Sequence, residues 1–488
     1  MCNLLKNIEN SEIINSVVDN FMPLTKIPRA SHHEEKISNY IVEWAKEQGL
    51  NPKQDSMFNV MVDIPATKGM ENKPCGILQA HMDMVVAVKD GKQFNPLTDT
   101  INVIRDNDEN TLKAEGTSLG ADDGCGVAII MSIVQNRMEH GPLRVIITVD
   151  EEDGMGGAFN IDKSWLKGCS YLINIDNEVS DEVLVSTASA NSVRIEKKIP
   201  YVEATRDLPI SIEIYNLKGG HSGIEIGKGR INGIICLAEF LNQIGKDIQF
   251  EIASFEGGTA SNAIPTKANA TLVINSADRD LIEQKLKKHC DSLNVKDTGI
   301  EDEIKFSISK YKETPKVVTE QEKKNIIQFA TEIIDGVYTW SENMEELVES
   351  SSNLGILRLD ENGLSISTLI RSSSPEKEKY ICEFQLDLSC KCGYKAEAIK
   401  MADAWEYDPN SRLLELVKQV FIKQNGKEIK VSAVHAGVEC GTFKSLNPDL
   451  DMISLGPDLT GAHTISETLY LNTIPKVWNL IEGIFDAI

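Results

Sequence analysis

The sequence predicts an α/β protein in which helices cover a mainly parallel sheet and a separate α+β domain is inserted. Apolar, strand-like runs alternate with helix-like segments between about residues 12 and 187, as expected of a parallel sheet with helical crossovers. The character changes between about 188 and 398, where strands such as 211–215 and 268–274 recur with helices such as 278–290. Candidate ligands for one site lie on both sides of this second segment, so we interpret it as an insertion.

The insertion makes the first domain discontinuous. Asp176 precedes it and His463 follows it, and we expect both side chains to reach the same site. The predicted arrangement is a first part over 1–187, an inserted lid or dimerisation domain over 188–398, and a second part over 399–488. A chain of 488 residues is too long for one ordinary core, which agrees with more than one domain.

The composition excludes several classes of protein. Hydrophobic residues make up 41% and charged residues 25% of the chain, as in globular proteins, and no apolar run approaches the roughly 20 residues of a membrane span. The start of the chain has no basic end followed by an apolar core, which argues against secretion. We therefore expect a cytoplasmic protein that does not bind membranes.

The net charge argues against a nucleic-acid partner, and the cysteine pattern indicates the redox state of the thiols. A formal net charge of -24 would repel phosphate backbones, so we expect no nucleic-acid partner. The ten cysteines are scattered without Cys-x-x-Cys spacing. Reduced thiols are therefore expected instead of a disulfide framework.

Imidazole and carboxylate side chains follow four expected strands, at the point where each strand ends. The four segments are 76–83, 145–152, 171–176 and 452–463. In the first, His81 and Asp83 are two residues apart in an extended run and therefore share a face. Because ligands of open α/β sheets bind outside the carboxyl ends of the strands, these side chains are expected to converge.

The converging residues have the chemistry of a two-metal hydrolase. The proposed ligands are His81, Asp123, Glu152, Asp176 and His463. Mixed imidazole and carboxylate ligands suit zinc, with cobalt and manganese as alternatives. Two ions need a bridging carboxylate. Asp123 is our candidate for this bridge and Asp122 is the alternative. The sequence separates the two poorly, because either could instead cap the following helix. Of the adjacent Glu151 and Glu152, one can be a ligand and the other a free base.

Two polar segments are interpreted as structural. The spacing of Ser31 and Glu34 fits a capping box, so the neighbouring His32 and His33 are assigned to a helix start in preference to metal binding. The serine-rich segment 349–353 is predicted to be a loop.

Six motifs occur together in this chain. They are His81-Met82-Asp83, 120–126, Glu151-Glu152, Asn174-Ile175-Asp176, 219–223 and 461–467. In combination they resemble the co-catalytic zinc peptidases that include glutamate carboxypeptidase, aminoacylase and carnosinase. Within that family the chain is most similar to the aminoacyl-histidine dipeptidases, from Ile27 to its C-terminal region.

The resemblance implies roles for the metal site. The first ion would be held by His81, Asp123 and Asp176, and the second by Asp123, Glu152 and His463. Glu151 would be the general base. Asp83 would accept a hydrogen bond from the far ring nitrogen of His81 and set its tautomer.

The resemblance also implies roles for four residues outside the metal site. His221 would stabilise the oxyanion, although by itself it reads as a loop histidine between glycines, and Asn262 would contact substrate. Arg371 would grip the terminal carboxylate of the substrate, which suits a bidentate guanidinium. Glu439 would hold the free amine, with a carboxylate that supports a ligand or a structural acid as alternatives.

The expected function is hydrolysis of unblocked dipeptides, including Xaa-His, by a hydroxide held between two metals with Glu151 moving its proton. An amidohydrolase of N-acyl amino acids in the same family is the alternative. A non-catalytic scaffold would be expected to lose Glu151 or a ligand, and all are present. The inserted domain could pair two subunits in a homodimer or imitate the second subunit within one chain.

Overall fold

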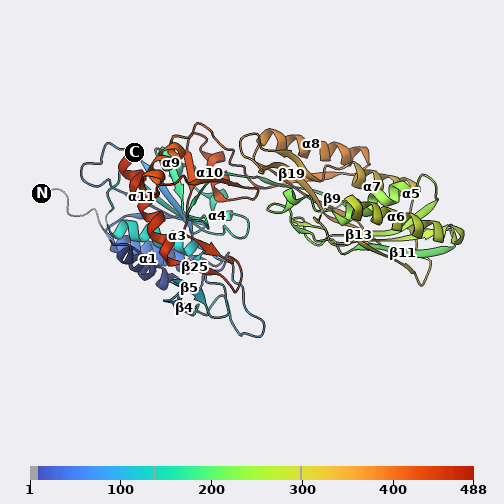
Figure 1. Cartoon of the computed structure of the whole chain (residues 1–488), viewed down its shortest axis with the longest axis horizontal. Helices are drawn as coiled ribbons and strands as arrows, with labels where there is room; N and C mark the ends of the chain where they lie inside the picture. The colour runs from blue at the N-terminus through green and yellow to red at the C-terminus, as the bar shows by residue number, and fades with distance from the viewer. Residues whose placement is uncertain (1–8, 137, 297–298) are drawn as a thin grey trace. The chain divides into compact units, whose positions relative to one another are not determined.

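The computed structural model describes residues 9–136, 138–296 and 299–488, which divide into two compact units. The first unit comprises residues up to Ser186 together with Tyr407–Ala433 and Val438–Ile488, and the second comprises Thr187–Glu406 and Val434–Gly437. The insertion begins and ends at the green and orange parts of the chain in Figure 1. We had placed its second boundary at 398/399, whereas this division puts residues up to Glu406 in the second unit.

Over the described residues, none of the helices combines the length and apolar character needed to cross a membrane. Most of the N-terminal start, residues 1–8, on which the expectation of no secretion signal was based, lies outside the described residues.

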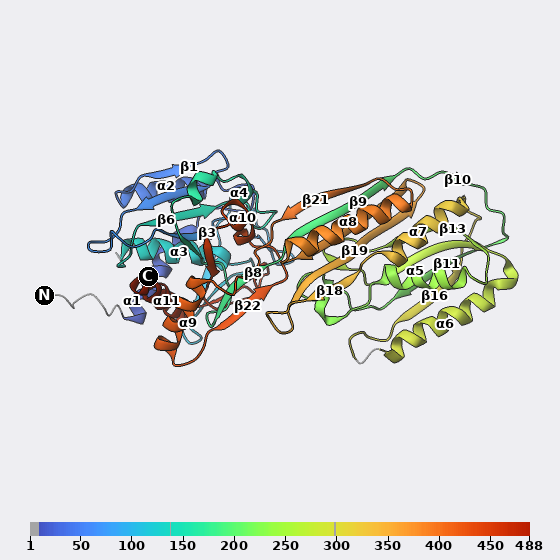
Figure 2. The same cartoon turned by 90° about the horizontal axis from the view of Figure 1, so that it is seen from above.

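The first unit is built on an eight-stranded sheet whose order is β1-β2-β6-β3-β7-β23-β8-β22. Its central strands are β6 (Leu143–Thr148), β3 (Gly76–His81), β7 (Tyr171–Asn174) and β23 (Asp451–Ser454), and they run parallel. The flanking strands are β1 (Pro52–Gln54), β2 (Val60–Ile64), β8 (Glu182–Thr187) and β22 (Lys430–Val434). Figure 2 shows β1, β6, β3, β8 and β22 following one another across the unit. The centre of the sheet is therefore parallel as expected, while the pairs β1·β2, β2·β6 and β8·β23 are antiparallel.

Helices cover this sheet and leave its central strands buried. They are α1 (Asn10–Leu24), α2 (Glu35–Glu47), α3 (Ala121–Gln135), α4 (Gly156–Asn160), α9 (Arg412–Asn425), α10 (Glu439–Leu446) and α11 (Ile474–Ala487). Helix α3 is apolar on nearly all sides because it packs between β3 and α1. A small sheet is formed by β24 (Leu459–Thr460), β25 (Thr468–Tyr470), β5 (Thr111–Ala114) and β4 (Val103–Asp106).

The second unit is an α+β layer structure, as the sequence predicts. Its antiparallel sheet contains β16 (Lys305–Lys310), β11 (Leu208–Tyr215), β15 (Ala268–Ile274), β13 (Phe250–Gly257), β19 (Val348–Asp360), β20 (Gly363–Ser372), β9 (Ala190–Lys197) and β21 (Ala396–Ala402), with β18 (Gly336–Trp340) paired to β19. Its helices are α5 (Gly233–Ile244), α6 (Arg279–Lys296), α7 (Glu320–Glu332) and α8 (Pro375–Lys391). The apolar residues of this sheet and its helices form one large core that includes Phe240, Phe255 and Phe329.

Two short strand pairs complete this unit. One joins β10 (Tyr201–Val202) to β17 (Val317–Val318), and the other joins β12 (Gly220–His221) to β14 (Ala263–Ile264). The second pair matters for the site because it carries His221.

Two predictions of local structure were wrong. The serine-rich segment 349–353 lies in β19, where Ser350, Ser351 and Ser352 are at most 1% exposed. Their hydroxyls are tolerated in the sheet because each has a side-chain partner, for example Gln385 Nε2 at 2.7 Å from Ser352 Oγ. The capping box is also absent, since Ser31 Oγ donates to Asp83 Oδ2 at 2.8 Å and α2 begins at Glu35 without a side-chain cap.

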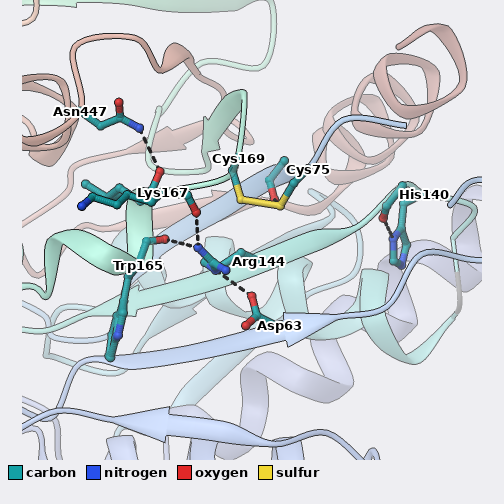
Figure 3. The surroundings of a disulfide bond; sticks show 11 residues. Asp63, Cys75, His140, Arg144, Trp165, Lys167, Cys169 and Asn447 are labelled. Atoms are coloured by element: carbon teal, nitrogen blue, oxygen red, sulfur yellow. Dashed lines mark hydrogen bonds and ion pairs between the residues drawn. A yellow bond between two sulfur atoms is a disulfide. The ribbon is translucent and has the colours of Figure 1, made fainter. Parts of the chain in front are cut away.

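One pair of cysteines departs from the expectation of reduced thiols. Cys75 and Cys169 form a disulfide (Figure 3). Cys75 directly precedes β3, and Cys169 lies two residues before the start of β7. The register of these parallel neighbours brings the two Cα atoms to 4.4 Å, although the residues are 94 positions apart in the sequence. Arg144 of β6 lies close by in the same view and donates to the carbonyl oxygens of Trp165 and Lys167.

Candidate metal centre and substrate-binding residues

The carboxyl ends of the central strands bring the predicted ligands together, as the positions in the sequence suggested. His81 is the last residue of β3, Glu151 and Glu152 follow β6, and Asp176 follows β7. Ligand atoms of His81, Asp123 and Asp176 lie within 4.8 Å of one another, as do those of His81, Asp122 and Glu152. Imidazole and carboxylate groups at this spacing are suitable ligands for divalent cations.

Asp122 lies between the two histidines. Its Oδ1 is 3.1 Å from His81 Nε2 and its Oδ2 is 3.0 Å from His463 Nε2. Glu152 approaches the same nitrogen of His463, with its Oε2 at 2.8 Å. The other oxygen of Glu152, Oε1, is buried and lacks a hydrogen-bond partner among the described residues, which fits a carboxylate that binds a cation.

The side chain of Asp123 accepts two hydrogen bonds from the backbone. Its Oδ2 accepts a hydrogen bond from the His81 amide at 3.2 Å, and its Oδ1 accepts one from the Gly126 amide at 3.1 Å. We had preferred Asp123 over Asp122 as the bridging carboxylate, whereas the geometry puts Asp122 between His81 and His463. The sequence could not separate the two, because the orientation of adjacent residues in a turn depends on the backbone conformation.

The charges of this cluster perturb one another strongly. Burial opposes protonation of His81, but Asp176 and the other carboxylates around it raise its pKa well above the usual value. Hydrogen bonds that His463 donates to Asp122 and Glu152 raise its pKa to about 11. Burial raises the pKa of Asp176 to about 6. The carboxylates therefore favour protons on the two imidazoles, and a divalent cation would compete with those protons for the same ring nitrogens.

Asp83 holds the turn that carries Glu151. It lies 3.3 Å from His81 Nδ1 through Oδ1, which also accepts the Glu151 amide at 3.1 Å. Its Oδ2 accepts the Glu152 amide at 3.3 Å. Burial, with the neighbouring acids, raises the pKa of Glu151 well above its usual range. A glutamate with a raised pKa suits a group that takes up and returns a proton.

Two residues to which the sequence assigned no role hold the Asp122 turn. Glu467, 2% exposed, accepts four backbone hydrogen bonds, from the amides of Leu119, Gly120, Ala121 and Asp122. Arg29, also 2% exposed, donates to the carbonyl oxygens of Met82, Asp83 and Gly120. Because Glu467 follows His463 by four residues, its carboxylate ties the loop of one predicted ligand to the turn of another.

Glu439 is buried against side chains of β3 and β6. Its side chain is 0% exposed, and its Oε2 accepts hydrogen bonds from Gln79 Nε2 at 2.6 Å and Thr148 Oγ1 at 2.7 Å. Burial raises its pKa to about 8. These contacts favour a supporting acid over the expected contact with a substrate amine.

In the second unit, the pairing of β12 with β14 brings His221 and Asn262 together. The Ser222 amide donates to the Asn262 carbonyl oxygen at 2.8 Å, and the Asn262 side chain is exposed. His221 Nδ1 accepts hydrogen bonds from the amides of Gly223 and Ile224, both at 3.2 Å. The neutral ring must therefore carry its proton on Nε2, which is a hydrogen-bond donor.

Arg371 is a buried cation without a carboxylate partner. It lies in β20 at 8% exposure, and the described residues include no ion-pair partner for it. Burial lowers its pKa to about 10. Burial and the charge of Arg371 together lower the pKa of His221, and they lower that of His435 to about 3. Both imidazoles are then neutral at neutral pH, so this region carries an uncompensated positive charge suited to an anion.

Glu178 is a further acid close enough to the cluster to feel its charge, and the sequence assigned it no role. Burial, together with Asp122 and Asp176, raises its pKa to about 7. Its position two residues after Asp176 was the available signal.

The fold and the cluster of metal-binding side chains are those expected of a metal-dependent peptidase. Comparison with known proteins leads to the same class. Residues 77–487 match peptidase family M20/M25/M40, and the chain belongs to that family. The resemblance inferred from the six motifs is therefore confirmed.

Two relatives are similar over almost their whole length. The chain is 31% identical to the cytosol non-specific dipeptidase of Escherichia coli (strain K12) over 476 residues, which cover 96% of this chain and 97% of the relative. The structure superposes on the aminoacylhistidine dipeptidase of Vibrio alginolyticus with a TM-score of 0.90 and 29% identity, covering 99% and 98% of the two chains. An aminopeptidase, PepT, from Bacillus cereus is similar in fold, with a TM-score of 0.56, 15% identity and coverage of 97% and 98%.

Replacing Glu467 by Ala is expected to destabilise the first unit, because three buried amides and one partly buried amide lose their acceptor. The expected loss is roughly 2–5 kcal/mol, measured by chemical denaturation followed with a probe in that unit. Glu467→Gln keeps one acceptor oxygen and should lose less. Equal stability of all three proteins would contradict a structural role for this carboxylate.

Proposed function

We propose that the protein is a metal-dependent dipeptidase that hydrolyses unblocked dipeptides, including Xaa-His. The observation that carries this proposal is the imidazole and carboxylate cluster at the carboxyl ends of β3, β6 and β7. The name of the Escherichia coli relative supports a dipeptide substrate and a cytosolic location, and that of the Vibrio alginolyticus relative supports Xaa-His.

The donor set fits two divalent cations, zinc in preference to cobalt or manganese. We assign Asp122 as the bridging ligand, because its two oxygens face different histidines. His81 and Asp176 would complete one site, and Glu152 and His463 the other. When bound, such a pair acidifies a shared water and polarises the scissile carbonyl.

Asp123 would then act on a ligand instead of on the metals. It holds the backbone amide of His81. Asp83 sets the tautomer of His81 through Nδ1, which leaves Nε2 to face the cations.

Proton transfer during hydrolysis is assigned to side chains of this protein. Glu151 takes it from the attacking water and delivers it to the leaving amine nitrogen, for which its raised pKa is suited. His221 donates from Nε2 to the developing oxyanion, and a positioned donor of this kind can contribute about 3 kcal/mol.

Substrate recognition is assigned to the second unit. Arg371 would bind the terminal carboxylate of the dipeptide, because it is a buried guanidinium without a partner of its own among the described residues. Asn262, exposed next to the His221 strand, would contact the peptide. Glu439 is assigned a structural role, because its carboxylate accepts hydrogen bonds from Gln79 in β3 and Thr148 in β6. We keep a homodimer through the inserted domain as a prediction.

Replacing Glu151 by Gln should lower kcat for a dipeptide by about 10²–10⁴-fold, because the proton acceptor is lost. Metal content should remain that of the wild-type protein. The exposed Glu47→Gln on α2 serves as the matched control. Undiminished turnover by Glu151→Gln, with contaminating peptidase excluded, would defeat the assignment.

Free and N-acetylated dipeptides compared on the wild-type enzyme distinguish a dipeptidase from an amidohydrolase of N-acyl amino acids.

Asp122→Asn and Asp123→Asn test the bridge. Asp122→Asn removes the carboxylate that faces both histidines, so the dialysed protein should retain fewer metal ions per chain by elemental analysis. Asp123→Asn should retain the wild-type number, since its contacts are to backbone amides. The reverse result would reinstate Asp123 as the bridge.

Arg371→Ala should raise KM for a dipeptide by roughly 10- to 100-fold, because a charged hydrogen bond to the carboxylate is lost. The substrate carboxylate is bound both before and during reaction, so kcat should change much less. Arg358→Ala, an exposed arginine in β19, is the control. An unchanged KM would show that the carboxylate binds elsewhere.

A further inference from the structure

His32 lies in the connection before α2, outside the residues assigned above to metal or substrate. Its Nδ1 is 3.0 Å from Asp150 Oδ1, and its Nε2 is 2.8 Å from Asp153 Oδ2. Both ring nitrogens therefore face carboxylates. The Nε2 contact is a hydrogen bond and the Nδ1 contact is an ion pair. Because ionised carboxylates carry no proton to donate, a doubly protonated, positively charged ring suits both contacts.

The two carboxylates flank the proposed base. Asp150 directly precedes Glu151, and Asp153 directly follows Glu152. One imidazolium thus holds both ends of the turn that carries the proposed base and a proposed metal ligand.

The backbone of this turn needs such support. Asp150 has φ 56° and Met155 has φ 58°, in the left-handed region that side chains other than glycine rarely adopt. Residues in this region persist where their surroundings hold them. His32 itself has φ 66°, so the clamping residue is also fixed in an unusual conformation.

Backbone hydrogen bonds close this turn, from the Met155 amide to the Glu151 carbonyl oxygen at 3.1 Å and from the Gly156 amide to the Asp150 carbonyl oxygen at 3.0 Å. Side chains other than His32 hold only its first part. Glu34 Oε1 accepts the Asp150 amide at 3.0 Å, and Asp83 accepts the amides of Glu151 and Glu152. Within the described ranges, the carboxylate of Asp153 has His32 as its one hydrogen-bonding partner. His32 therefore provides the side-chain contact at the far end of the turn.

We propose that His32 is a positioning residue whose imidazolium clamps Asp150 and Asp153 and thereby holds Glu151 in place for proton transfer. This rests on the proposed function, in which Glu151 is the base. The side chain of His32 is 57% exposed, and exposed ion pairs contribute little to global stability. The effect is therefore expected on turnover, because misplacing a catalytic group by about 1 Å can lower the rate by about 10²-fold.

The clamp also depends on pH. The charged groups acting on the ring are Asp153, Asp150 and Glu34. The hydrogen bond to Asp153, and then the charge of Asp150, raise the pKa of His32. Since the folded-state pKa is raised, the clamp is present at lower pH and is lost as the pH rises through that value.

The test uses the full-length, metal-loaded enzyme. His32→Ala is expected to lower kcat roughly tenfold while metal content, KM and the unfolding temperature stay at wild-type values. The matched control is His33→Ala, the neighbouring exposed histidine, which should leave kcat unchanged.

Two further readouts separate positioning from a general structural effect. Asp153→Ala should also lower kcat, and the double variant should be no worse than His32→Ala alone, because His32→Ala already removes the contact to Asp153. The ratio of wild-type to His32→Ala kcat should fall as the pH rises. Additive losses, a ratio independent of pH, or loss of metal in His32→Ala would each overturn the clamp.

Glu151→Gln measured beside these variants keeps the two proposals apart. If Glu151→Gln retains full turnover, the proposed base is wrong. If Glu151→Gln is inactive while the His32 and Asp153 losses are additive, only the clamp fails.

Discussion

The concentration of buried carboxylates at one edge of a sheet is the constraint on which the rest of this structure depends. Asp83, Asp122, Asp123, Glu152 and Asp176 approach one another around His81, and an ionised carboxylate without a compensating charge is costly to bury. In the structure the two imidazoles supply part of that charge, and their raised pKa values express the same electrostatics. Divalent cations would supply the rest.

The chain holds this repelling cluster together with backbone contacts. Glu467 accepts the amides of the Asp122 turn, Arg29 donates to carbonyl oxygens of two ligand-bearing segments, and Asp83 accepts the amides of the Glu151 turn. These contacts fix the backbone segments that carry the ligand side chains. The proposed His32 clamp extends the same principle to the far side of the Glu151 turn. Arg371 is the opposite case, a buried positive charge that suits a ligand carboxylate.

Much of the site could be predicted because strand ends and motifs are local in sequence. The apolar runs before His81, Glu151 and Asp176 place these residues at the carboxyl ends of neighbouring parallel strands, whatever the details of packing. The roles of Asp122, Glu467 and Arg29 could not be predicted in this way. They depend on which backbone groups are brought within hydrogen-bonding distance by segments hundreds of residues apart, such as Glu467 and Leu119.

The sequence by itself determined the α/β class, the inserted α+β domain, the family and the set of residues available to bind metal, because hydrophobic periodicity and residue chemistry are properties of short segments. Only the tertiary structure decided which aspartate faces both histidines, that Cys75 meets Cys169, that Ser350–Ser352 lie in a buried strand, and that Glu439 is hydrogen-bonded to Gln79 and Thr148. The physical reason is the same in each case. Strand register and turn conformation choose the partner of a side chain, and both are set by contacts between residues distant in the chain.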